Sequence, residues 1–523
     1  MRIKIEDTKL LNNTTLAFAN QNSELLELYS EKHPFYDLNN AIKGKSDFDV
    51  EKRKLLVNTL KKQYQNSKIN LENYKNVKEN IEKLSLSNTY TVCTGQQIHP
   101  FLGPMLVHYK ILQCLSQSQV LNEQYPALNF VPVFWMASED HDFDEIKNTQ
   151  LFGQNYYWNS VQKGPVGRFQ LNDFQPTINE IKLKLENDVD SLNLFKQLAL
   201  FYEQSDTLSE ATFKLVNFLY SEYGLLCLNP DDKELKASFK QVVFNDVVHE
   251  VNHEKFIEQS NKLALKGYKL QLKSKSINFF SIKGNERHSI NKINEVYEIN
   301  GLKLSKDELI NDVVENTENY SPNAVMRPVY QEFILPNVVY IGGNAEINYW
   351  LQLSEVFAVN NIIPCHLKLR KSIWITNKKI EEYLQKNQIN VVDFLLSETD
   401  DEILALIDEK ENKTFKDFKL IQKELINELH QMDKNYANEF LEQFKKMNSQ
   451  LKKIDVEMKE KNKVKHQEKM NQIKKLKSKG FEKNNIQERQ KSVLEFYLTE
   501  NQKFNLVSKK VDFSIQDSEI LAF

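Results

Sequence analysis

The chain has 523 residues, enough for two to four domains of ordinary size. Hydrophobic residues make up 41% and charged residues 27%, and the formal net charge is −3, so the composition is that of a globular protein with no overall attraction to nucleic acid. Four distant cysteines without ligand spacing argue against disulfide frameworks and zinc ribbons. No signal peptide and no run of 18 apolar residues is found, so we expect a cytoplasmic protein that does not enter a membrane.

Glycine and proline are scarce and unevenly placed. The chain has 13 Gly and 12 Pro, under 5% together where about 12% is average. The last proline is Pro364, and Gly480 is the only glycine after Gly343. A tail with so little turn punctuation predicts long helices. We therefore expect a core over 1–375, a helical coiled-coil domain over 376–499 and a segment over 500–523 that returns to the core.

The first 375 residues alternate between helical and strand patterns. Residues 45–86 have apolar residues at helical spacing and predict one amphipathic helix. Residues 90–94 favour a strand, 105–115 a helix, and 130–137 a strand buried on both faces, as in a parallel sheet. Further strands are expected at 224–229, 277–283 and 338–341, and Asn300-Gly301 predicts a hairpin. Together they indicate an α/β class with a parallel sheet and insertions near 150–220 and 230–320.

The tail carries a repeating apolar pattern. From Phe418 to Met458 apolar residues step by three or four, and from Phe444 onward the steps match a coiled-coil seam, with a possible bend at 433–435. Gly480 suits a helix end, and 504–523 alternate enough for a strand. Residues 411–480 hold 18 Lys, no Arg and 11 Asp or Glu. A patch for phosphate backbones is one interpretation, but the absence of Arg favours a solvated helix surface.

The first segment with chemical potential spans residues 94–104. A strand that ends in Gly95, a turn with Gln96 and Gln97, and a helix that begins after Gly103-Pro104 could present backbone N–H groups to an anion, with Lys110 as a point charge. The pattern matches neither a Walker loop nor a dinucleotide fingerprint. A plain strand–turn–helix connection is the alternative interpretation.

The second segment, 138–145, follows the apolar strand at once. Asp140, His141, Asp142 and Glu145 would lie at the carboxyl end of that strand, where open α/β sheets bind ligands. They could act as general base, as metal ligands or as hydrogen-bond partners of hydroxyl and amine groups. A solvated loop that caps an acidic helix is the alternative. No second ligand cluster is evident, which disfavours a metal.

The third segment spans 321–350. Arg327 stands between apolar residues and is expected to pair with a carboxylate or phosphate, while Gly342-Gly343 allow close backbone approach to a ligand and Glu346 follows on the next helix. A core salt bridge and a tight turn are the alternative. Arg370 and Ser372 repeat the pattern after another apolar run.

These segments, in this order, resemble the BshC family of bacillithiol biosynthesis. The resemblance rests on TGQQ…GP…YK at 94–110, FWMASEDHDFDEI at 134–146, SPNAVMRPVYQEFILPNVVYIGG at 321–343, EINYWLQL at 346–353 and IQER at 486–489. It runs essentially from end to end. It implies a Rossmann-like core with a coiled-coil arm used for dimerisation. It also implies a ligase that adds L-cysteine to glucosaminyl-malate through an amide bond, an adenine nucleotide (ATP or ADP) as cofactor, and no metal.

The resemblance assigns roles residue by residue. Our own hypothesis is that Asp140, His141 and Asp142 orient the amino sugar and remove its proton, and that Arg327 or Arg370 binds a carboxylate. The expected substrate-binding residues are Gln96, Gln97, Gly103, Pro104, Lys110, Glu145, Asn323, Gln331, Gly342, Gly343, Glu346, Tyr349, Trp350, Arg370 and Ser372. Two stretches depart from the family pattern, Ile98-His99-Pro100 and Asn344-Ala345.

Two other functions fit parts of the pattern. A coiled-coil dimer with a nucleotide-binding domain could be a scaffold without catalytic activity, although charge clustered at three strand ends argues against it. A metal-dependent hydrolase could use the Glu139–Asp142 cluster as its ligands.

Overall fold

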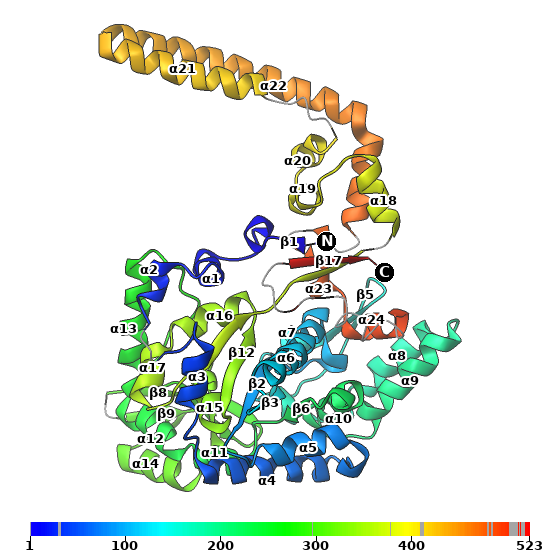
Figure 1. The fold of residues 1–523 in the computed structure, drawn as a ribbon, viewed down its shortest axis with the longest axis vertical. Helices are drawn as coiled ribbons and strands as arrows, with labels where there is room; N and C mark the ends of the chain where they lie inside the picture. Colours follow the sequence, from blue (N-terminus) through cyan, green and yellow to red (C-terminus); the bar gives the residue numbers. More distant parts are fainter. Residues whose placement is uncertain are drawn as a thin grey trace.

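The computed structural model describes residues 2–29, 33–294, 296–376, 378–407, 413–432, 434–478, 481–482, 485–500, 511, 513 and 518–522. It has a wide α/β core from which a long helical arm extends (Figure 1). The fold class expected from the sequence, a Rossmann-like parallel sheet with a coiled-coil arm, is confirmed. None of the described helices is long and apolar enough to cross a membrane.

The centre of the core is a five-stranded sheet in the order β13-β12-β2-β3-β6. All four neighbouring pairs are parallel. The strands are β2 (Thr89–Gln97), β3 (Asn129–Ala137), β6 (Leu226–Leu228), β12 (Asn337–Gly342) and β13 (His366–Leu369). The chain builds outward from β2 first through β3 and β6 and then through β12 and β13, so the order reverses between β2 and β12. Ligands of doubly wound sheets bind at such a switch point, beyond the carboxyl ends of the strands.

Apolar strand sequences explain why this sheet is buried on both faces. Seven of the nine residues of β3 are buried, and so are all six of β12. Helix α6 packs on β2 and β3. The helices of the core outside the insertions are α1 (Asn13–Ala19), α2 (Ser23–Leu26), α3 (Leu38–Gly44), α6 (Met105–Gln124), α7 (Phe143–Ile146), α15 (Met326–Ile334), α16 (Asn344–Leu351) and α17 (Ser354–Val359).

The single helix expected over residues 45–86 is wrong. The structure has two helices there, α4 (Val50–Asn66) and α5 (Lys75–Lys83). Between them Lys68 adopts a left-handed φ of 57°, and the side chain of Asn70 accepts the amide hydrogen of Glu72. Apolar spacing continues across the break because both helices cover the same core, which hid the interruption from a periodicity count.

Two insertions interrupt the α/β core. The first contains β4 (Asn148–Leu151), β5 (Gln154–Tyr157), α8 (Gln175–Lys184), α9 (Val189–Glu203) and α10 (Leu208–Tyr220). The second carries an antiparallel sheet of β7 (Phe279–Lys283), β8 (Glu286–Ile293), β9 (Val296–Ile299), β10 (Leu302–Leu304) and β11 (Tyr320–Pro322), with helices α11 (Lys233–Ser238), α12 (Lys240–His249), α13 (Val251–Leu265) and α14 (Lys306–Glu315). The hairpin predicted at Asn300-Gly301 is confirmed, since Ile299 pairs with Leu302.

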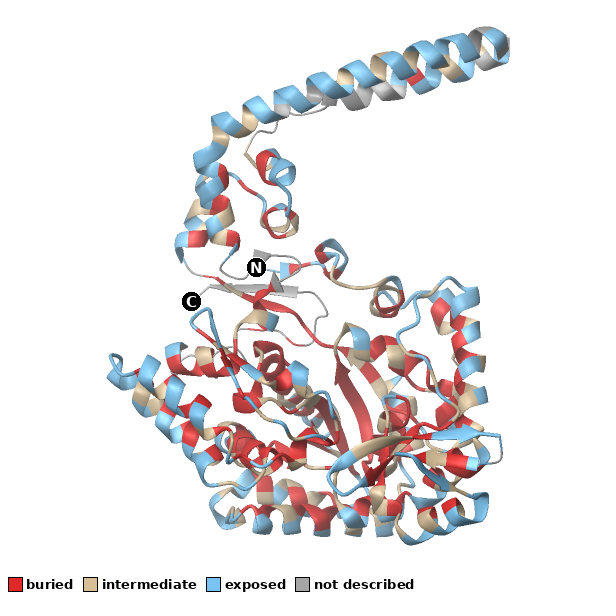
Figure 2. Cartoon of the chain, turned by 180° about the vertical axis from the view of Figure 1, so that it is seen from behind, coloured by how far each residue is buried: buried red, intermediate tan, exposed pale blue. Residues whose placement is uncertain are grey.

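The arm is a helical hairpin. Helix α21 (Lys413–Met432) and helix α22 (Lys434–Lys477) lie side by side, so the expected bend is confirmed. At its base are α18 (Lys378–Lys386), α19 (Val391–Leu396) and α20 (Asp400–Ala405). Figure 2 shows that most of the arm is exposed. Its exposed apolar residues include Ile454 and Met458 of the predicted seam, and Ile421, Leu425 and Phe440 of the apolar pattern that precedes it. Gly480 lies outside the described residues.

The chain returns to the core earlier than the sequence indicated. Helices α23 (Gln487–Gln490) and α24 (Val493–Glu500), which were expected in the helical domain, contact α6 instead. The returning strand, β17 (Ser518–Ala522), pairs with β14 (Ile373–Thr376) and β1 (Arg2–Ile3) rather than with the central sheet. The alternation on which that strand was predicted lies upstream of β17. Of the alternating residues on which the prediction rested, Val511 and Phe513 are buried in the main core, and Ile515 lies outside the described residues.

Candidate active site

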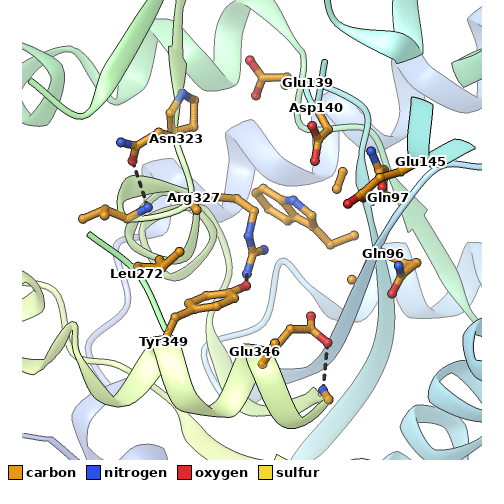
Figure 3. A pocket seen from close by; sticks show the side chains of 18 of the residues that line it. Gln96, Gln97, Glu139, Asp140, Glu145, Leu272, Asn323, Arg327, Glu346 and Tyr349 are labelled. Atoms are coloured by element: carbon orange, nitrogen blue, oxygen red, sulfur yellow. Dashed lines mark hydrogen bonds between the residues drawn. The ribbon is translucent and has the colours of Figure 1, made fainter. Parts of the chain in front are cut away.

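A cavity of about 630 Å³ opens at the carboxyl ends of β2, β3 and β12, at the switch point of the sheet. Twelve of the residues expected at the site line it: Gln96, Gln97, Lys110, Asp140, His141, Glu145, Asn323, Arg327, Gly343, Glu346, Tyr349 and Arg370. Several of their side chains converge from three sides (Figure 3). The three sequence segments are thus one site, because parallel strands place their ends along one edge of the sheet. We call it the first cavity.

A buried ion pair forms its floor. Lys110 of α6 pairs with the Glu346 carboxylate and donates to Gly95 O at 2.7 Å and to Gln96 Oε1 at 3.1 Å. Glu346 also accepts the Gly343 amide hydrogen at 2.8 Å and the Tyr340 hydroxyl at 2.6 Å. Burial raises the pKa of Glu346, but Lys110 and these donors outweigh it and hold the pKa below its usual value. Lys110 therefore fixes two strand ends and is not a free charge for a ligand.

Arg327 faces the cavity with neutral partners only. Its guanidinium donates to Gln331 Oε1 at 3.1 Å and to the Tyr349 hydroxyl at 3.1 Å, and it lies 5.7 Å from the centre of the Tyr340 ring. No ion pair joins Arg327 to a carboxylate among the described residues. Arg327 is half-buried, and a partly buried charge with hydrogen bonds but no counter-ion is a place for an anionic ligand. The alternative of a core salt bridge is not what the structure contains.

The loop after β3 rests on a second buried charge network. Glu139 lies 2.7 Å from Lys236 Nζ, Lys236 contacts Asp231 at 3.1 Å, and Asp231 accepts two hydrogen bonds from Arg168 at 2.6 and 2.8 Å. Burial raises the pKa of Asp231, but Lys236 and Arg168 outweigh it and lower the value to about 2. Of these four residues, sequence reasoning singled out only Glu139, as part of the acidic cluster of the hydrolase alternative. The Pro230-Asp231-Asp232 end of the predicted strand at 224–229 was the available signal.

The three expected catalytic residues of this loop have different surroundings. Asp140 Oδ1 accepts the amide hydrogens of His141 at 2.7 Å and Asp142 at 3.1 Å, and Asp140 lines the cavity. Asp142 does not line it. Its Oδ1 accepts the Glu145 amide hydrogen at 3.3 Å and caps α7, so the alternative of a helix cap is correct for Asp142. Burial, with Asp142 and Asp140 nearby, raises the pKa of Glu145.

His141 is held by an arginine that the sequence did not reveal. Its Nδ1 lies 3.0 Å from an Arg287 nitrogen, and Arg287 stacks 4.1 Å from the centre of the Phe280 ring. A guanidinium only donates, so Nδ1 accepts and the neutral ring carries its proton on Nε2. Burial and then Arg287 lower the pKa of His141, which favours the neutral ring. The expectation that His141 removes a proton is therefore corrected, because its other nitrogen is a donor.

Arg370 and Ser372 bind a protein carboxylate. Glu488 of α23 accepts two hydrogen bonds from Arg370 at 2.9 and 2.6 Å and one from Ser372 at 3.2 Å. All three side chains are buried. The expectation that Arg370 and Ser372 bind substrate is corrected on this geometry, since their hydrogen-bonding groups are occupied by the segment that follows the arm.

The same returning segment covers Gly103 and Pro104. The amide of Met105 donates to Lys491 O at 2.9 Å, and Gly103 O accepts the amide hydrogen of Val493 at 2.8 Å. The start of α6 therefore does not offer the Met105 N–H to an anion, as the sequence had suggested. Gly103 and Pro104 line a smaller neighbouring cavity instead.

Three further expected residues do not line the first cavity but contact residues that do. Gln331 holds Arg327, Trp350 stacks on Tyr340 with ring centres 4.6 Å apart, and Gly342 O accepts the Arg370 amide hydrogen at 2.7 Å. Lining residues that the sequence-based site did not include are Trp135, Glu139, Lys273, Phe280, Arg287, Tyr340 and Arg489.

The acidic cluster does not form a metal site. In the part of the chain that the structure describes, no three His, Cys, Asp or Glu side chains converge as ligands. Glu139 turns to Lys236 and Asp142 to the α7 cap. The hydrolase alternative therefore lacks a ligand set among these residues. The four cysteines are buried and unbridged, and burial raises the pKa of Cys93, which does not suit a nucleophile.

Comparison with known proteins agrees with this arrangement. Residues 1–371 match the family described as "Bacillithiol biosynthesis BshC, N-terminal Rossmann-like domain", and residues 373–516 match "Bacillithiol biosynthesis BshC, C-terminal coiled-coil domain". A Flavobacterium psychrophilum protein named "Putative cysteine ligase BshC" is 33% identical over 92% of this chain and 91% of its own length. Proteins of the same name from Flavobacterium johnsoniae (37% identical, 69% of this chain, 68% of theirs) and Cytophaga hutchinsonii (32%, 76% and 74%) are also similar. The chain belongs to the BshC family of bacillithiol biosynthesis.

Proposed function

We propose that this protein is a ligase that joins the carboxyl group of L-cysteine to the amino group of glucosaminyl-malate and so produces bacillithiol. The observation that carries the proposal is the division of charge in the first cavity. Among the described residues, Asp140 on one side forms no ion pair with a Lys or Arg, and Arg327 on the other forms none with a carboxylate. Glucosaminyl-malate carries an amine at one end and carboxylates at the other, which is the complementary pattern.

The geometry assigns roles within this proposal. Arg327, held by Gln331 and Tyr349, binds a malate carboxylate. Asp140 binds the sugar amine and accepts its proton, so that the neutral amine can attack. His141 donates from Nε2 to an oxygen of the substrate or of the developing tetrahedral centre. Asp142 acts through loop structure alone, as the cap of α7.

Amide formation also needs an activated carboxylate, which we assign to an adenine nucleotide. When bound, ATP supplies the phosphoryl or adenylyl group that converts the cysteine carboxylate into an ester or anhydride with a good leaving group. Besides Arg327 and Arg489, the cavity cations outside an ion pair in the described chain are Lys273 and Arg287, and they are the groups that fit phosphate oxygens. Product analysis distinguishes ADP and phosphate from AMP and pyrophosphate.

We also propose a homodimer formed through the arm. Phe440, Ile454 and Met458 lie on α22 with 38, 49 and 51% of their surface exposed, although Ile454 and Met458 belong to the predicted seam and Phe440 directly precedes it. A second copy of the arm would cover them. Sedimentation of the full chain should give a dimer, and replacing Ile454 and Met458 with Glu should give a monomer. A wild-type monomer would contradict this part of the proposal.

Metabolite analysis of cells that lack the protein tests the reaction itself. We expect bacillithiol to disappear and glucosaminyl-malate to accumulate. Wild-type protein should restore bacillithiol, whereas Asp140→Asn and Arg327→Ala should not, when present at equal amounts. Lys163→Ala, an exposed change outside the cavity, is the matched control. Unchanged bacillithiol in the deletion strain would contradict the proposed function.

A further inference from the structure

A second cavity of about 410 Å³ adjoins the first. Five residues line both: Gln96, Gln97, Leu106, Glu145 and Arg489. Its remaining walls come from the β4–β5 hairpin, the His99–Pro104 turn and the segment after α23. A reaction that joins two substrates needs two adjacent binding sites that share a boundary, and these two cavities have that arrangement.

The segment that follows the arm supplies Arg489, one of the two charged residues on this boundary. Gln487 makes two hydrogen bonds with the backbone of Ile375, at 2.7 and 2.8 Å, and Glu488 is locked to Arg370. Ser492 Oγ donates to Gln150 O at 2.5 Å. Arg489 is therefore fixed at its backbone on both sides. Within the described chain, its side chain is in no ion pair, and neither is that of Glu145.

The two cavities differ in charge. Apart from the residues shared with the second cavity, the first cavity is lined by five cationic and three acidic side chains. This surplus of two positive charges suits a dicarboxylate. The residues that line only the second cavity are amides, hydroxyls, Gly103, Pro104 and His99, and burial lowers the pKa of His99 to about 4, so its ring is neutral at pH 7. Among the described residues that line the second cavity, Arg489 and Glu145 are then the only charged ones, one of each sign, which suits a small zwitterion.

We propose that the second cavity is the amino-acid subsite, in which Arg489 binds the α-carboxylate and Glu145 the α-ammonium of free L-cysteine. This rests on the proposed function for the identity of the amino acid, and it leaves the first cavity to glucosaminyl-malate. The segment that follows the coiled-coil arm thereby contributes a specificity residue, Arg489, to the site. This role explains why α23 is anchored so firmly to the core.

Titration calorimetry with L-cysteine under reducing conditions tests the subsite. Wild-type protein should bind cysteine, and Arg489→Ala should weaken binding roughly 10-fold or more through loss of a charge-assisted pair. Lys491→Ala is the matched control, since Lys491 is the nearest cation in the same segment and lines neither cavity. It should bind as wild type does. Cysteamine, which lacks the carboxylate, should bind wild type and Arg489→Ala equally.

A second ligand separates this inference from the function itself. Arg489→Ala should retain wild-type affinity for glucosaminyl-malate, whereas Arg327→Ala should lose it and retain cysteine binding. Cysteine affinity that falls in Arg327→Ala and not in Arg489→Ala would overturn the subsite while the ligase stands. Wild-type protein that binds glucosaminyl-malate but not cysteine would overturn it too. Binding of neither substrate, with no bacillithiol lost on deletion, would contradict the ligase as well.

Discussion

Glu488 binds both terminal nitrogens of Arg370, at 2.9 and 2.6 Å, and this buried pair joins the segment after the arm to the end of β13. Ser372 and the amide of Ile373 point to the same carboxylate, at 3.2 and 3.4 Å. The returning chain is thus part of the active-site wall. This chain therefore cannot be divided cleanly into a core and an arm.

Glu488→Gln should destabilise the protein by about 3–5 kcal/mol, because it leaves the Arg370 charge buried without a counter-ion. Urea denaturation measures the change, and limited proteolysis should cleave the segment around α23 and α24 first. Glu203→Gln, which breaks the more exposed pair with Lys182, should cost no more than about 1 kcal/mol. Similar losses for the two variants would show that the buried pair adds nothing special.

The turn before α6 gives a second prediction. Gly103 has a φ of +66°, and an added Cβ would lie 2.7 Å from Cβ and Cγ of His99. Gly153 has a similar φ of +76°, but nothing lies within 4 Å of an added Cβ. Each change to Ala costs about 1 kcal/mol for the left-handed backbone.

Gly103→Ala should cost more than Gly153→Ala, because His99 and the docked residues 491–493 must shift as well. Thermal unfolding of both variants measures this, and cysteine affinity should fall only in Gly103→Ala. Equal stability of the two variants would mean that the contact with His99 relaxes freely.

How much the sequence predicted depends on how local each feature is. The ends of β2, β3 and β12 were recognisable, since an apolar run followed by polar residues is a pattern within one short stretch. Arg287 and Glu488 were not recognisable as site residues, because their partners lie 146 and 118 positions away. Arg287 stands in an antiparallel hairpin that reads as ordinary surface strand, and only the folded insertion brings it to His141.

The protonation of His141 can be tested by nuclear magnetic resonance. Burial and Arg287 both lower its pKa, and Asp140 and Asp142 oppose them. Arg287→Gln removes a lowering influence, so the pKa should rise toward or above the usual value of about 6.5. The ring C–H shifts followed against pH give this value. His288, on the same strand, is an internal reference within the same spectra. A His141 pKa that stays constant would mean that Arg287 does not govern the ring.

A buried carboxylate behind the site predicts an unusual dependence of stability on pH. Asp246 accepts hydrogen bonds from the Asn278 amide at 2.6 Å and from Asn252 at 2.9 Å. Asn278 in turn accepts from Asn323 at 3.1 Å, and Asn323 Oδ1 accepts the amide hydrogens of Val325 and Met326 where the helix that carries Arg327 begins. Burial raises the pKa of Asp246 to about 6, against about 3.9 in an unfolded chain.

The sign of the effect follows from that shift. Because the folded pKa is the higher one, the stabilising contribution of Asp246 is complete below pH 4 and is lost as pH rises through 6. Between pH 4 and pH 7 the wild type should therefore lose about 2 kcal/mol relative to Asp246→Asn, which has no such titration. Urea denaturation of both proteins at several pH values measures the difference. Asp188→Asn should change in the opposite direction, since Ser191 lowers the pKa of that exposed carboxylate. A stability difference between the wild type and Asp246→Asn that is the same at every pH would mean that Asp246 titrates normally. The series of hydrogen bonds from Asp246 to the helix of Arg327 would then not respond to pH.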